Sequence, residues 1–257
     1  MLIELAPMVP HPERTRQHAP EVFGNDITTY RTTYTQRAGG TPQIVLVEQP
    51  DPGSVLLPHY HASDQYQVFM DGDGMLGKHP LQPVSIHYTN RFTGYGPIVA
   101  GPRGLTYYVL RPAIDPLGPG QYLHVPELRE RVKAYKGKRR TFTAQIGTRS
   151  LEELSALRET VETKLFAVDE PEEDAGILAA EILLPRGAGY LAPEPSAGGG
   201  QVLLVVQGEI ATATFNGGPR SALAVTHDEK RATVTAGESG AQLLFMQYPR
   251  NQGRSPE

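Results

Sequence analysis

GSVLLPHYHASDQYQVFMDG, residues 53–72, is the segment of this sequence that decides the fold. It contains two histidines one residue apart, His59 and His61, and a strand-length run of mostly apolar residues that follows Gln65. Side chains on a strand alternate between its two faces, so both imidazoles are expected on the same face. Their nitrogens could therefore meet one ion or one ligand. This segment is the best candidate for a reaction centre in the chain.

A second copy of the same frame occurs 136 residues later, as GYLAPEPSAGGGQVLLVVQG over residues 189–208. Both copies begin and end with glycine, and both place a glutamine, Gln65 or Gln201, before an apolar run of strand length. Pro195 and Ala197 stand at the two histidine positions of the second copy. We therefore expect an internal duplication in which only the first copy keeps its histidines.

The composition predicts a protein made of many short strands. The chain has 257 residues, with 27 glycines and 23 prolines scattered between short apolar runs, which is typical of strands joined by tight turns. This length fits one large β-domain or two small ones. The sequence has no cysteine, which excludes disulfide bonds, thiolate catalysis and sulfur-ligated metal centres. Any metal ion must therefore be held by nitrogen and oxygen ligands.

The charge pattern argues against several classes of partner. The net charge is −4, and the only basic run lies between residues 133 and 140, which we interpret as a solvated connector rather than a nucleic-acid surface. No stretch approaches the roughly 20 apolar residues that span a bilayer, and the first residues do not resemble a signal peptide. We expect a cytoplasmic protein that binds a small-molecule ligand and neither nucleic acid nor a membrane.

Two stretches predict helices between the two copies of the frame. Residues 126–135 and 150–166 are rich in Glu, Arg, Leu and Ala, and the second opens with a capping-box pattern before apolar residues recur at helical spacing. The predicted organisation is therefore a first β-domain with the candidate site, a helical linker, a second β-domain, and a flexible tail without apolar residues. The boundaries that we predict for these four parts are 1–120, 121–166, 167–250 and 251–257.

The first frame resembles the first conserved motif of the cupin superfamily, which has a glycine, an HxH pair, a glutamate and a second glycine at these intervals. The stretch 96–111 resembles the second cupin motif, with Tyr107 where the family has a third histidine and Arg111 where it often has asparagine. The resemblance covers roughly residues 40–112 and 175–249. It implies an all-β fold of two tandem cupin barrels (double-stranded β-helix, or jelly roll) with a few short connecting helices. A homodimer is a further expectation from the family.

The resemblance also implies a metal site, because the four motif residues of the family hold a divalent transition metal in the barrel mouth. Carried over, the ligands are His59, His61, Gln65 and Tyr107, and the ion would be Fe, Ni, Mn or Zn. Glutamine offers only a neutral carbonyl oxygen, and a phenol binds a metal well only when ionised. Metal binding should then be weaker than at a site with a carboxylate. The alternative is a polar pocket that holds no metal.

The alternation of side chains also selects substrate-binding candidates. It places Gln67 and Phe69 on the inward face of the strand that begins near Gln65. It places Arg111 on the inward face of the strand that contains Tyr107. Arg111 could clamp a substrate carboxylate, or it could be a strand-end arginine with its head in water. His87 lies on the segment that leads to the second motif and could line the mouth of the site.

Three functions remain open at this point. The preferred one is a metal-dependent dioxygenase, lyase or isomerase on an oxygenated or carboxylated substrate, with no nucleotide cofactor. His59 and His61 would anchor the ion, and Tyr107 would transfer a proton. The second is a metal-free proton-transfer enzyme of the epimerase or eliminase kind, with a histidine as base and Tyr107 as acid. The third is a non-catalytic cupin that binds a sugar or another effector.

Overall fold

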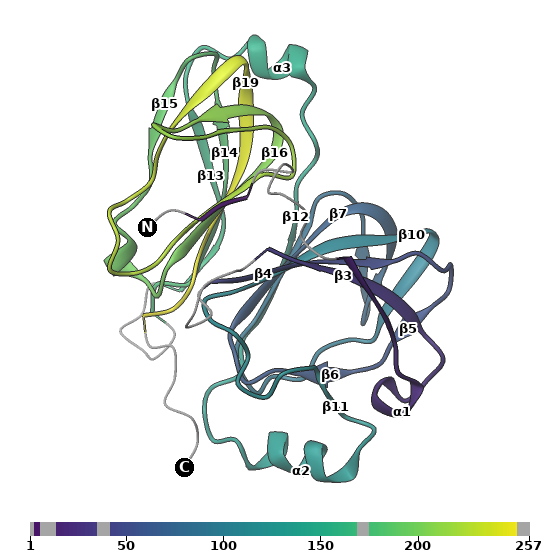
Figure 1. Ribbon diagram of the computed structural model, residues 1–257. Helices are drawn as coiled ribbons and strands as arrows, with labels where there is room; N and C mark the ends of the chain where they lie inside the picture. Colours follow the sequence, from purple (N-terminus) through teal and green to yellow (C-terminus); the bar gives the residue numbers. More distant parts are fainter. Residues whose placement is uncertain (1–2, 6–13, 35–41, 169–174, 251–257) are drawn as a thin grey trace. The chain divides into compact units, whose positions relative to one another are not determined.

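The structure of the protein, a computed structural model, describes residues 3–5, 14–34, 42–168 and 175–250 (Figure 1). It consists mainly of antiparallel strands in a jelly-roll-like arrangement, with a few short helices. This confirms the predicted fold class. The segment predicted as a flexible tail, residues 251–257, lies outside the described residues. In the part of the chain that is described, no helix is long and apolar enough to cross a membrane.

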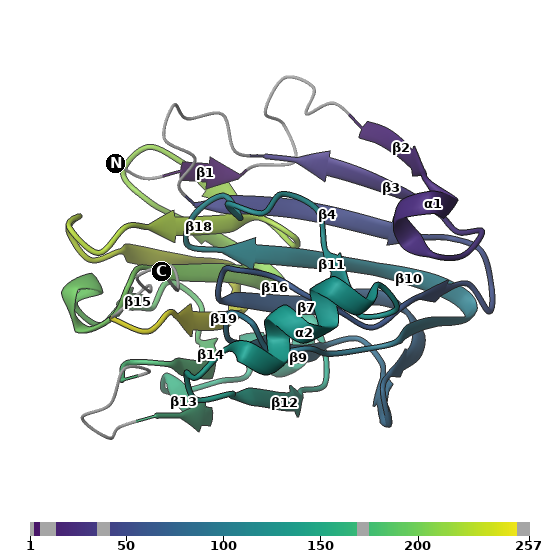
Figure 2. The ribbon, with the colours of Figure 1, turned by 90° about the horizontal axis from the view of Figure 1, so that it is seen from below.

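The chain divides into two compact units, and the first, here called the N-terminal unit, covers the described residues between 14 and 145. Its elements are β2 (Arg14–His18), α1 (Pro20–Phe23), β3 (Thr28–Thr33), β4 (Gln43–Gln49), β5 (Val55–Leu56), β6 (His59–Tyr60), β7 (Gln65–Leu76), β8 (His79–Leu81), β9 (Ser85–Thr89), β10 (Ile98–Arg111), β11 (Gln121–Tyr122), α2 (Pro126–Ala134) and β12 (Thr141–Gln145). The main sheet has the order β12-β9-β7-β10-β4-β3-β2, with β5 beside β10 and β8 beside β7, while β11 pairs with β6. Strands β7, β10, β4 and β3 run side by side (Figure 2).

The second, or C-terminal, unit contains the described residues between 146 and 250 together with residues 3–5. Its elements are β1 (Ile3–Leu5), α3 (Leu151–Ser155), β13 (Val161–Ala167), β14 (Leu178–Leu184), β15 (Gly189–Leu191), a 3-10 turn (Pro195–Ala197), β16 (Gln201–Ala211), β17 (Asn216–Gly217), β18 (Ala222–Val225) and β19 (Thr233–Gln247). The sheet order is β1-β18-β16-β19-β14-β13, with β15 beside β19 and β17 beside β16. The first described strand, β1, thus pairs with β18 of this unit.

The two units use the same strand order. Strands β9, β7, β10, β4 and β3 of the N-terminal unit correspond in order to β18, β16, β19, β14 and β13 of the C-terminal unit. The pairing register also corresponds at an offset of 136 residues, because Gln67 lies opposite Val109 and Leu203 lies opposite Phe245. The repeat that is visible in the sequence therefore extends to the topology and to the register of the two long central strands.

The glycine that ends each copy of the frame has a structural reason. Gly72 and Gly208 both have positive φ, +84° and +76°. A Cβ atom at Gly72 would collide with the carbonyl oxygen of Gly104, and one at Gly208 would collide with that of Gly240. Each pair marks a register irregularity where two long strands approach closely. The same bend is thus built in the same way in both units.

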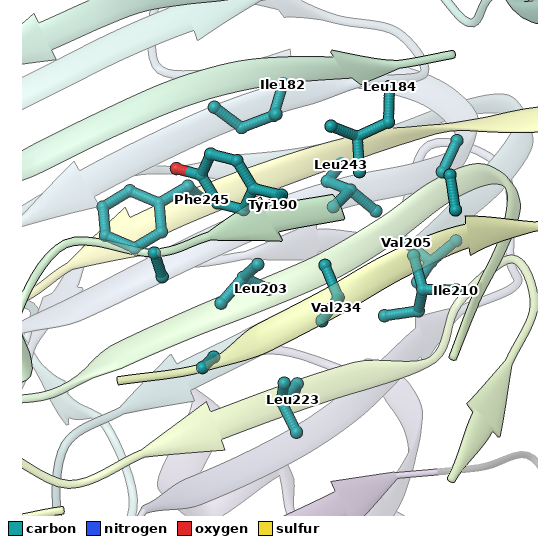
Figure 3. Packing of buried hydrophobic residues seen from close by; sticks show 14 of the residues in the cluster. Ile182, Leu184, Tyr190, Leu203, Val205, Ile210, Leu223, Val234, Leu243 and Phe245 are labelled. Carbon is teal, nitrogen blue, oxygen red and sulfur yellow. The ribbon is translucent and has the colours of Figure 1, made fainter. Parts of the chain in front are cut away.

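The interior of the C-terminal unit is filled by apolar side chains. Leu203, Leu243 and Phe245 are fully buried in its core cluster, which Figure 3 shows from close by. At the offset of 136 residues, these positions correspond to Gln67, Tyr107 and Val109 of the N-terminal unit. Apolar residues therefore replace two polar ones, and the larger phenylalanine replaces valine.

The helix prediction is only partly correct. Helix α2 occupies the first predicted stretch, and α3 begins with the predicted capping box, in which Ser150 Oγ accepts from the Glu153 amide at 3.1 Å. The helix nevertheless ends at Ser155, and the rest of the predicted stretch forms strand β13, which pairs with β14. Pairing along β14 outweighs the helical spacing of a few leucines, because strand formation depends on cross-strand neighbours more than on local preference.

Candidate functional site

A cavity of about 190 Å³ lies inside the N-terminal unit. Its walls come from β2 to β7, β10 and β11, and from the loop that follows β10. Five of the eight side chains predicted from the sequence line this cavity, and the structure therefore brings most of the candidate site together. These five are His59, His61, Gln67, Tyr107 and Arg111.

The other three predicted residues are buried next to the cavity and do not line it. Gln65 is fully buried and contacts Arg111, and Phe69 packs against the ring of Tyr107 with 4.9 Å between centroids. His87 Nδ1 lies 3.1 Å from Thr143 Oγ1, and burial lowers the pKa of His87 to about 3. Their placement gives Gln65 and Phe69 a supporting role, and it keeps His87 uncharged behind the cavity wall.

His59 is held in one tautomer by two hydrogen bonds. Its Nδ1 lies 2.8 Å from the carbonyl oxygen of Leu57, which can only accept, so Nδ1 carries the proton. Its Nε2 therefore accepts from the hydroxyl of Tyr95, at 2.7 Å. Burial lowers the pKa of His59 to about 4, so the ring is neutral at neutral pH. Gly120 makes room for this ring, because a Cβ there would lie 2.7 Å from His59 Cδ2.

His61 is held between an acid and a guanidinium. Its Nδ1 lies 2.6 Å from Asp115 Oδ2, and its Nε2 lies 3.0 Å from Arg111 Nη2. A guanidinium can only donate, so His61 Nε2 accepts from Arg111. The ring proton is therefore on Nδ1, which donates a hydrogen bond to the carboxylate of Asp115. Burial, followed by the charge of Arg111, holds the pKa of His61 well below its usual range. Burial also raises the pKa of Asp115. The hydrogen bond from the Leu117 amide and the charge of Arg111 act in the opposite direction and reduce this rise.

Arg111 completes this network from the end of β10. Its Nε and Nη2 donate to Gln65 Oε1 at 3.1 and 2.9 Å, and its Nη1 donates to Gln43 Oε1 at 2.7 Å. The side chain is 7% exposed. The alternative interpretation of Arg111, a strand-end arginine with its head in water, is therefore wrong. The guanidinium lies against two of the four proposed metal ligands, His61 and Gln65.

These residues do not fit a divalent metal in the arrangement that the structure shows. Both imidazole Nε2 atoms are engaged, His59 by Tyr95 and His61 by Arg111. Burial raises the pKa of Tyr107, so this side chain is a neutral phenol rather than a phenolate ligand. A metal ion would also be placed next to the positive charge of Arg111. Among the residues that the structure describes, no cluster of three or more His, Asp or Glu could hold a metal ion.

Arg31 was not among the residues predicted from the sequence, yet it lines the same cavity from β3. Within the described part of the chain, its guanidinium has no hydrogen-bond or ion-pair partner, and its Nε atom is buried. Its positive charge acts to lower the pKa of Tyr107 and of Tyr122, another lining residue, although burial raises both overall. Arg31 is the only charged residue of its strand, TTYRTT, and that was the only signal available.

The cavity carries a net positive charge. Its charged lining groups, among the described residues, are the guanidiniums of Arg31 and Arg111 and the carboxylate of Asp115. His59 and His61 contribute none, because both are held neutral. Two cations and one anion leave a charge of +1. Such a cavity favours a negatively charged ligand, since an anion there would reduce the electrostatic cost of one buried and one half-buried cation.

Comparison with solved structures relates this architecture to known proteins. A candidate dioxygenase from Nostoc punctiforme matches with a TM-score of 0.56 and 12% identity, over 100% of this chain and 84% of the other. The pirin of Escherichia coli, solved with nickel(II), matches with a TM-score of 0.52 and 12% identity, over 97% and 100%. An oxalate decarboxylase variant from Bacillus subtilis matches with a TM-score of 0.54 and 12% identity, over 98% and 78%.

The chain has a cupin fold. At such low identity the cupin fold is all that the similarity shows, because one fold can host many unrelated activities. The nickel of the E. coli pirin belongs to that protein. No family model and no curated protein sequence matches this chain. The function has to be argued from the site itself.

Proposed function

We propose that the N-terminal unit binds a small organic anion in its cavity, without a metal ion, and that the negative group of the ligand lies against Arg31. The observation that carries the proposal is the Arg31 guanidinium, which faces the cavity and has no partner among the described residues. A guanidinium with a buried nitrogen and no partner is costly, and a carboxylate satisfies it through two parallel hydrogen bonds.

The rest of the network supports a preformed site. Arg111 is fixed by Gln65, Gln43 and His61, so it adds positive charge to the wall with little freedom to move. In this proposal Arg111 supplies the positive charge that a metal supplies in other proteins of this fold. The Fe, Ni, Mn or Zn ion considered from the sequence is then not needed. The cupin superfamily membership, the duplicated origin of the two units, the homodimer and the cytoplasmic location all stay predictions.

Calorimetric titration with small carboxylic acids tests the proposal. The wild-type protein should bind at least one of acetate, 3-methylbutanoate and methylsuccinate, and Arg31→Met should weaken that binding at least about tenfold, as expected for a lost charged hydrogen bond. Arg129→Met removes the same charge from an exposed position of α2 and is the matched control. Binding that is equal in the Arg31→Met and Arg129→Met proteins would exclude Arg31 as the anion site.

A second candidate function, proton transfer on the bound acid, is favoured by the 2.7 Å contact between Tyr95 and His59. The Tyr95 oxygen could take a proton from a carbon of the ligand while its own proton passes to His59 Nε2. The electron pair of the broken C–H bond would stay on the ligand as an enolate near the arginines. This step needs a carbonyl next to the carbon, so a 2-oxo acid is the appropriate probe.

Deuterium exchange tests this second candidate. The proton on the third carbon of 3-methyl-2-oxobutanoate should exchange in D₂O faster with the wild-type protein than in buffer, as followed by NMR. The Tyr95→Phe protein should bind the acid and show only the buffer rate. An equal rate in both proteins would rule out Tyr95, and anion binding alone would remain.

A further inference from the structure

The cavity is lined by hydrogen-bond donors and by aliphatic side chains. Three donors of the lining, the guanidinium of Arg31 and the hydroxyls of Tyr107 and Tyr122, have no hydrogen-bond partner among the described residues. Arg31 is close enough for its charge to lower the pKa of both tyrosines. A carboxylate offers about four lone-pair sites, so it can accept from more than one of these donors. The donors therefore suit one carboxylate.

Five valine, leucine and isoleucine side chains stand among the polar residues of the lining. Val45 and Val109 lie opposite each other on β4 and β10, and Val47 is the cross-strand partner of Tyr107. Leu56 and the half-exposed Ile114 add to the same lining. Contact with these side chains favours a ligand whose remainder is an alkyl chain, since each buried methylene group contributes about 0.8 kcal/mol to the transfer out of water.

The charge and the volume limit the ligand further. A single carboxylate neutralises the charge of +1 on the lining, whereas a second one would leave an unpaired negative charge in the cavity. The net positive charge of the lining disfavours an amino group on the ligand. A cavity of about 150 Å³ holds benzene, with its six heavy atoms, so about 190 Å³ corresponds to roughly eight.

We infer that the ligand is a short, branched aliphatic monocarboxylate of about seven or eight heavy atoms, with its carboxylate on Arg31 and its alkyl group against the valines of β4 and β10. This inference rests on the proposed function and names the class of ligand for that site. It follows from the position of Arg31, the aliphatic side chains of the lining and the size of the cavity together.

The test compares four probes by calorimetry on the full-length protein. We expect 3-methylbutanoate to bind about 50-fold more tightly than acetate, because it buries three further carbon groups. Its neutral isostere, 3-methylbutanamide, should bind at least about tenfold more weakly, because the charged hydrogen bonds are lost. Methylsuccinate, which adds a second carboxylate, should also be at least about tenfold weaker, because one negative charge stays unpaired.

A matched variant comes from the other unit of the chain. Val109→Phe introduces the residue found at the corresponding position, Phe245, and fills the cavity without changing its charge. It should abolish the binding of 3-methylbutanoate. The fold of this variant is checked by circular dichroism, and Val109→Ala, which enlarges the cavity, is the second variant. It should keep Arg31-dependent binding and prefer a longer acid, such as 4-methylpentanoate.

The outcomes separate this inference from the proposed function. Binding of acetate or methylsuccinate as tight as that of 3-methylbutanoate, and lost in Arg31→Met, would overturn the ligand class and leave the anion site standing. Unchanged binding in a folded Val109→Phe protein would also overturn the ligand class. If no carboxylate binds, or if Arg31→Met has no effect, the proposed function itself fails.

Discussion

Replacement of Arg111 by methionine should destabilise the N-terminal unit by about 3 kcal/mol. The change removes the donor from two buried acceptors, Gln65 Oε1 and His61 Nε2, and from the part-buried Gln43 Oε1. A buried acceptor that loses its partner costs roughly 1–3 kcal/mol, so the two buried ones account for the expected loss. The methionine keeps most of the apolar stem of the arginine, which limits any effect of lost packing.

The C-terminal unit provides a graded control for this experiment. The position that corresponds to Arg111 is Gln247, which accepts a hydrogen bond from Gln201 Nε2 at 2.9 Å. Arg111→Gln should therefore rebuild an amide pair with Gln65 and should cost about half as much as Arg111→Met. Arg129→Met reports the effect of losing a positive charge at an exposed position.

Urea unfolding followed by far-UV circular dichroism gives the free energies of these variants. Because the chain has two units, the transitions are fitted separately where they are resolved. A free energy of unfolding for Arg111→Met within about 0.5 kcal/mol of the wild-type value, a difference typical of surface substitutions, would refute the role assigned to Arg111. It is also refuted if Arg111→Gln is as unstable as Arg111→Met, because the amide pair would then contribute nothing.

Three further predictions concern the same site. Protein purified without a nickel column should contain no stoichiometric metal and should not bind nickel(II) at micromolar concentration in calorimetry; one ion per chain would contradict the position assigned to Arg111 as the cation of the site. The pKa of His59 is about 4 in the folded protein, below the ordinary 6.5, so stability present above pH 6.5 should be lost as the pH falls towards 4, by about 3 kcal/mol from this residue. The free energy of unfolding, measured at several pH values, should depend less on pH in His59→Gln than in the wild type. An identical pH dependence in both proteins would contradict the lowered pKa of His59. Gly120→Ala should displace His59 and weaken the binding of 3-methylbutanoate, whereas Gly147→Ala, which meets no atom within 4 Å, should not; equal affinities would show that the glycine is not needed there.

The parts of the site that were predictable from the sequence are those set by local alternation. The inward positions of Gln67 and Tyr107 follow from the period of two along a strand. The spacing of the two motifs predicted that the strands with these residues lie close together, and β7 and β10 do pair. The structure agrees with both. The sequence also has Gln65 in place of the glutamate of the cupin motif and Arg111 in place of an asparagine. Together these two residues could have predicted a contact between them, because a neutral amide oxygen suits a neighbouring arginine better than it suits a metal ion.

The rest of the site depends on contacts between segments that are far apart in the chain. Arg31 enters the cavity because β3 pairs with β4, and Asp115 reaches His61 from the loop after β10. No local pattern encodes either contact. The helix predicted over residues 150–166 failed for the same reason, since β13 is stabilised by its pairing with β14 rather than by its own sequence preference.

The two glycine bends and the common strand register have a consequence for how such a chain can change. The same backbone frame encloses a solid interior in one unit and a cavity in the other, and the central strands differ at positions such as 67 and 203, 107 and 243, 109 and 245, and 111 and 247. Burial of a leucine or phenylalanine contributes roughly 1.5–3 kcal/mol, so the solid unit can supply stability that the hollow unit gives up. Selection for a new ligand can then act on one half of the molecule while the other half keeps the chain folded. A protein engineer could accordingly open space in the C-terminal unit by replacing Phe245 with valine, the residue at the corresponding position, 109, of the cavity lining.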